Sequence, residues 1–76
     1  MLAFLGGTGP EGKGLAMRFA IAGESIVIGS RDGDRAAATA AELRGMIDGH
    51  VSIEGTDNLN AARQSEVIFL TVPYDA

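Results

Sequence analysis

The chain has 76 residues, of which 46% are hydrophobic and 21% charged, and its formal net charge is −4. This composition is typical of a globular protein, but a chain of this length buries only roughly 60% of its unfolded surface, so we expect marginal stability. The acidic balance argues against a nucleic-acid-binding protein, which would normally present a basic face. The sequence contains no cysteine, which excludes disulfides and thiolate metal sites.

No apolar run is long enough to span a membrane. The first residues, Met1 to Leu5, lack the basic start and long apolar core of a signal peptide. We therefore expect a cytoplasmic protein whose partners are small molecules, with no membrane or nucleic-acid partner.

Strand-like and helix-like segments alternate along the chain. We expect strands at 1–5, 25–28, 51–53 and 66–72, and helices at 10–22, 34–47 and 59–63. Gly23 is placed to end the first helix and Gly29 the second strand, while Asp32 or Asp34 can cap the second helix. The predicted buried face of the first helix carries Leu15, Ala16, Phe19 and Ala20, and that of the second carries Ala36, Ala40, Leu43 and Ile47. This order predicts an α/β, Rossmann-like NAD(P)-binding fold with a parallel sheet in strand order 3-2-1-4.

The last predicted strand would form an exposed apolar edge, which natural sheets avoid. We therefore expect residues 1–76 to be the N-terminal portion of a Rossmann domain, with the rest of the sheet and a C-terminal domain missing. The alternative is a small protein that pairs this edge with a second copy of itself.

A G-x-G-x-x-G pattern at Gly7, Gly9 and Gly12 follows the first predicted strand and opens the first predicted helix. In that position such glycines permit a tight turn, a close approach to a pyrophosphate, and contact between helix and sheet. Pro10 has no N–H, so the donors are expected from Gly9, Glu11 and Gly12. The alternative is a glycine-rich loop without a ligand.

The end of the second predicted strand indicates which dinucleotide binds. NAD-binding sites carry an acidic residue there, about 20 residues beyond the glycines, whereas this chain has Ser30 and Arg31. A hydroxyl and a guanidinium suit a 2′-phosphate, and Arg35 can reach the same pocket. The sequence therefore predicts NADP. Asp32 and Asp34 lie beside these arginines, and solvated loop charges are the alternative interpretation.

Four stretches resemble the NADPH-dependent reductases of the deazaflavin coenzyme F420: residues 6–16, residues 26–31, the alanine-rich helix predicted at 34–47, and residues 70–74. The resemblance extends over essentially the whole chain but only the first third of a typical member. It implies that Thr8 and the following loop positions contact the pyrophosphate, and that Ser30, Arg31 and Arg35 contact the 2′-phosphate. The nicotinamide side would be bordered by Val72, Pro73 and Tyr74.

The resemblance implies an oxidoreductase that transfers hydride between NADPH and coenzyme F420, although this segment alone is expected to be inactive. We expect no catalytic residue and no metal ligand in it, and we interpret His50 as a solvated loop residue. Any homo-oligomer would form through the missing C-terminal region. Two alternatives remain: an NADP-dependent reductase of another acceptor, and a non-catalytic NADP-binding redox sensor.

Overall fold

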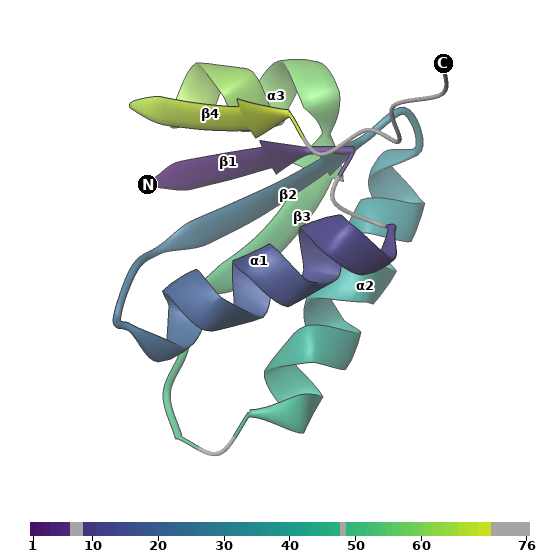
Figure 1. The fold of residues 1–76 in the computed structure, drawn as a ribbon. Coiled ribbons are helices and arrows are strands. Elements are labelled where there is room, and N and C mark those ends of the chain that lie inside the picture. The colour runs from purple at the N-terminus through teal and green to yellow at the C-terminus, as the bar shows by residue number, and fades with distance from the viewer. Residues whose placement is uncertain (7–8, 48, 71–76) are drawn as a thin grey trace.

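In the computed structural model the chain folds into a parallel four-stranded sheet with helices on both faces (Figure 1). The structure describes residues 1–6, 9–47 and 49–70. The strands are β1 (Leu2–Leu5), β2 (Ile26–Ser30), β3 (Ile53–Asp57) and β4 (Val67–Leu70). The helices are α1 (Pro10–Ile21), α2 (Gly33–Met46) and α3 (Asn58–Gln64). The strand order is β3-β2-β1-β4, so the predicted α/β fold and its 3-2-1-4 order are confirmed. Among the described residues, no helix has the length and apolar character needed to cross a membrane.

The core divides into two layers on either side of β2. Ile26 and Ile28 face α1 and α2, whereas Val27 faces α3 and packs with Ala61. All five residues of β2 are buried, as expected for a central parallel strand covered on both faces. The layer under α1 contains a cluster of three aromatic rings, in which Phe4 and Phe69 stack with their centroids 5.0 Å apart and Phe19 adjoins both.

The ends of the first two helices follow from local hydrogen bonds. Gly23 ends α1 with a φ of +97°, and its N–H donates to the Ala20 carbonyl while Glu24 N–H donates to the Phe19 carbonyl. This pair of bonds is a Schellman motif, which favours glycine at that position. At the start of α2 the capping side chain is that of Asp32.

Several predicted boundaries were wrong. The third strand runs over Ile53–Asp57 rather than 51–53, because pairing with β2 and contact with α2 override the polar character of residues 54–57. Gly29 lies inside β2 rather than ending it. Leu15 was placed on the buried face of α1 but is 39% exposed. Ile47 lies just beyond α2, as its C-cap residue.

The apolar side chains of β4 are less covered than those of the central strands. Ile68 and Leu70 share the face that α3 covers over β1 and β2, yet they are 46% and 73% exposed. In Figure 1 β4 is the outer strand next to β1. Within the described residues β2 is thus buried on both faces, whereas β4 forms the exposed apolar edge that its sequence predicts. Residues 71–72 of the predicted strand lie outside the described residues.

Candidate functional site

The carboxyl ends of β1 and β2 meet the first turns of α1 and α2 at one edge of the sheet (Figure 1). The turn after β1 is joined to β2 because Gly6, with a φ of +75°, donates its N–H to the Gly29 carbonyl at 2.9 Å. Strand β1 lies between β2, the next strand along the chain, and β4, the last one. The order of strands reverses here, and open α/β sheets bind ligands at such a point.

The start of α1 leaves backbone donors available. Gly9 is its N-cap residue and provides no side-chain cap, and the first helical bond runs from Lys13 N–H to the Gly9 carbonyl at 3.0 Å. Gly9 was expected to donate to a ligand, but its N–H donates to the Gly6 carbonyl at 3.5 Å. The amides of Glu11 and Gly12 precede the first helical bond, so the helix does not use them. No atom of the described residues lies within 4 Å of the place a Cβ would take on Gly9. Among the described residues these two amides have no partner, and such amides at a helix start suit an anion such as a pyrophosphate.

Several residues of the expected pyrophosphate loop fall outside the described part of the chain. Gly7 and Thr8 lie outside the described residues, as do the side chains of Pro10 and Glu11. Gly12 is buried in the first turn of α1. Pro10 is the first residue of α1, where the fixed φ of proline suits the helix.

At the end of β2 a hydroxyl and two guanidinium groups lie close in sequence. Ser30 is only 9% exposed, and its Oγ accepts a hydrogen bond from Asp32 N–H at 3.3 Å. Arg31 and Arg35 are exposed, and neither guanidinium forms an ion pair with any described residue. Guanidinium groups and a hydroxyl donor fit the three oxygens of a phosphate monoester.

One contact at this edge was missed in the sequence. A Cβ on Gly29 would stand 2.8 Å from Asn58 Oδ1 and 2.9 Å from Leu5 Cδ2, so a larger residue here would displace these two side chains. Asn58 Oδ1 is buried and has no hydrogen-bond partner among the described residues. A glycine inside a strand is the signal that could have indicated such a close approach.

The neighbouring strand end carries a second capping aspartate. Asp57 Oδ1 accepts from Asn60 N–H at 2.9 Å and Oδ2 from Asn60 Nδ2 at 2.6 Å. These hydrogen bonds from the Asn60 backbone and side chain lower the pKa of Asp57 below its usual 3.8.

Because this pKa is lowered on folding, the stabilising contribution of Asp57 is complete above the unfolded value and is lost as the pH falls through the folded value. We expect Asp57→Asn to be less stable than the wild type at neutral pH and to lose less stability on acidification. Urea unfolding between about pH 2 and pH 7 measures this, and parallel pH profiles for the two proteins would contradict it.

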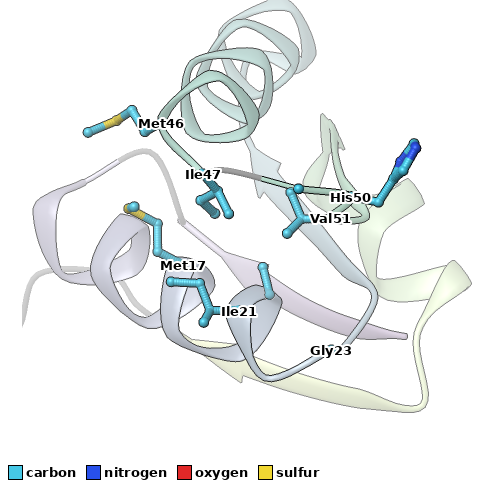
Figure 2. A pocket seen from close by; sticks show the side chains of 9 residues that line it. Met17, Ile21, Gly23, Met46, Ile47, His50 and Val51 are labelled. Carbon is cyan, nitrogen blue, oxygen red and sulfur yellow. The ribbon is translucent and has the colours of Figure 1, made fainter.

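An apolar hollow of about 550 Å³ lies at the opposite side of the sheet, near the amino-terminal ends of the strands (Figure 2). Met17 and Ile21 of α1 line it together with Met46, Ile47 and Val51. His50 is exposed, and its ring points away from these apolar side chains, as the prediction of a solvated loop residue requires. None of the residues expected to bind a cofactor lines this hollow.

The remaining predicted contacts are not tested by the structure. Val72, Pro73 and Tyr74 lie outside the described residues. Within the described ranges, no group of three or more His, Cys, Asp or Glu side chains is placed to hold a metal ion.

The sheet order and the free helix start at the point of strand reversal place the chain in the Rossmann-like class of dinucleotide-binding folds. Comparison with known families is more specific. The family described as NADP oxidoreductase, coenzyme F420-dependent, matches residues 1–76. The chain belongs to this family, and the resemblance drawn from its sequence is confirmed.

Curated relatives come from methanogenic archaea. The chain is 47% identical over 78 residues to the F420-dependent NADP reductase of Methanothermobacter thermautotrophicus, covering 99% of this chain and 33% of that protein. It is 43% identical to the reductase of the same name from Methanothermobacter marburgensis, covering 99% of this chain and 34% of the relative. The F420-dependent NADP reductase of Methanocaldococcus jannaschii is 36% identical, over 97% of this chain and 34% of its own length. The chain thus spans about a third of the length of these relatives.

Proposed function

We propose that the chain is the NADP(H)-binding part of an oxidoreductase that transfers hydride between NADPH and coenzyme F420. Family membership and the names of the relatives support the reaction. The observation that carries the choice of cofactor is the nearly buried Ser30 hydroxyl beside the exposed Arg31 and Arg35, at the strand end where an NAD-binding site has an acid. The proposal includes a cytoplasmic protein in which residues 1–76 are the N-terminal portion of the NADP-binding domain.

In this proposal the cofactor is held at three places. The pyrophosphate lies on the loop and the first turn of α1, at Gly7, Thr8, Gly9, Pro10, Glu11 and Gly12. The 2′-phosphate lies at Ser30, Arg31 and Arg35. The nicotinamide side is bordered by Val72, Pro73 and Tyr74.

The chemistry comes from the two cofactors, since bound NADPH supplies the hydride and the deazaflavin receives it. The residues of this chain bind and orient. The free amides of Glu11 and Gly12, at the positive end of the α1 dipole, stabilise an anion without requiring a charged side chain. The hydrogen bond from Gly6 N–H to the Gly29 carbonyl fixes the pyrophosphate loop relative to the end of β2, so the two phosphate subsites keep a constant separation. No proton carrier is needed from the described residues.

Binding titrations on residues 1–76 and a hydride-transfer assay on a longer natural protein that contains them test the proposal. We expect NADP to bind at least about 10-fold more tightly than NAD, because one charged hydrogen bond contributes on the order of 1.5–3 kcal/mol. We also expect NADPH oxidation that depends on added coenzyme F420. Equal affinity for NAD and NADP would refute the cofactor assignment. NADPH oxidation with a flavin but not F420 would indicate another acceptor, and binding without turnover by the longest natural chain would indicate a redox sensor.

A further inference from the structure

Asp32 lies beside the site proposed for the 2′-phosphate, where its negative charge would repel the ligand if nothing offset it. Its carboxylate does not face solvent freely, because Oδ1 accepts hydrogen bonds from Asp34 N–H at 3.0 Å and from Arg35 N–H at 3.3 Å. Both donors belong to the first turn of α2, where the helix dipole is positive. The negative charge of Asp32 is therefore partly offset by the helix it caps.

The backbone of Asp32 has a second role. Its extended conformation, with φ −106° and ψ 107°, directs its N–H at Ser30 Oγ, 3.3 Å away. In the hydrogen bonds of the described residues, this hydroxyl acts only as an acceptor. A hydroxyl has one proton to donate, and that of Ser30 remains available although the side chain is nine-tenths buried.

These bonds form a connected chain. The Asp32 carboxylate holds the Asp32 backbone against α2, the Asp32 N–H occupies a lone pair of Ser30, and the Ser30 proton is left to donate outward. A serine oxygen has two lone pairs, so one remains, but the Asp32 N–H confines the Ser30 proton to directions away from the Asp32 backbone. A phosphate offers that proton several charged acceptor oxygens, whereas the ribose of NAD offers one neutral hydroxyl, so a fixed outward donor favours the phosphate.

We propose that Asp32 is a positioning residue that sets the preference for NADP over NAD by fixing Ser30 as a hydrogen-bond donor. The inference rests on the proposed function and goes beyond it, because it gives a role to an acidic side chain that does not touch the cofactor.

The test compares NADP and NAD affinities of the full chain by titration, using Asp32→Ala, Asp32→Asn and Ser30→Ala. We expect Asp32→Ala to lower the ratio of NADP to NAD affinity by about 10-fold, as loss of one charged hydrogen bond would. Asparagine is an equally good N-cap with the same acceptor oxygen, so Asp32→Asn should keep the wild-type ratio. In the double variant, Asp32→Ala should cause no further fall beyond that of Ser30→Ala, because the two residues act through one contact.

Asp57→Ala is the matched control, since Asp57 caps α3 with the same type of bond one strand away. It should lower the stability but leave the affinity ratio unchanged. If Asp32→Ala also leaves the ratio unchanged, or if its effect adds fully to that of Ser30→Ala, the inference is overturned. If Asp32→Ala does not fold, Asp32→Gly replaces it, because glycine is a tolerated N-cap without an acceptor side chain. A wild-type ratio near one would instead refute the proposed function.

Discussion

Replacing Gly55 by alanine should destabilise the protein by more than about 3 kcal/mol, beyond the usual cost of overpacking. A Cβ at this position would stand 2.0 Å from the carbonyl oxygen of Ala36 and 2.6 Å from the N of Ala37. Both atoms belong to the backbone of α2, which cannot move aside like a flexible side chain. Relief would require α2 to lift off β3, although Ala36, Ala40 and Leu43 of this helix are fully buried in the core. Urea unfolding followed by circular dichroism measures the loss.

Gly45→Ala is the matched control for this substitution. Gly45 lies in α2 itself, and apart from the adjacent backbone of that helix a Cβ there would meet no described atom within 4 Å. We expect this variant to be stabilised by roughly 0.5–1 kcal/mol, because alanine favours a helix more than glycine does. If Gly55→Ala unfolds at the same urea concentration as Gly45→Ala, the close contact between α2 and β3 does not exist in solution.

The same glycine explains why the third strand was predicted in the wrong place. Hydrophobic periodicity identified the segments whose burial is continuous, such as Val27 and its neighbours in β2, and it found the order of elements correctly. The sequence from Ile53 to Asp57 has no apolar alternation, since its strand conformation depends on β2 at one edge and α2 above it. A close approach of two backbones leaves no signal in the sequence except the missing side chain.

The sequence predicted those parts of the candidate site that depend only on where a residue lies along a strand or helix. Ser30 ends a buried strand and Arg31 follows it. Since parallel strands have their carboxyl ends at one edge of the sheet, the sequence placed both residues beside the start of α1. What it could not indicate is the direction of the hydrogen bonds. Asp32 looked unfavourable for a phosphate site in the sequence, whereas the structure turns its Oδ1 into α2. The contact of Asn58 with Gly29 joins residues far apart in the chain, and no local pattern encodes it.

Removing both arginines at the end of β2 should weaken NADP binding about 100-fold while changing NAD binding little. Arg31→Ala and Arg35→Ala should each reduce NADP affinity about 10-fold, the lower limit for a charged hydrogen bond, because both side chains are exposed to solvent. The effects should add if each guanidinium contacts the phosphate independently. Titration of the full chain with both dinucleotides, at one fixed ionic strength, measures this difference.

Two comparisons separate recognition of the 2′-phosphate from general effects of charge and folding. Arg63→Ala removes the same charge from an exposed residue in the last turn of α3, away from the carboxyl end of β2, and should alter NADP and NAD binding equally. NAD lacks the 2′-phosphate but shares the remainder of NADP, so any damage to the glycine loop or to the fold weakens both ligands and cancels in their ratio. Since neither guanidinium is paired with a described residue, its removal leaves no buried charge behind, and a fall confined to NADP reports the phosphate contact itself. An unchanged ratio in the double variant would mean that these arginines are solvated surface charges.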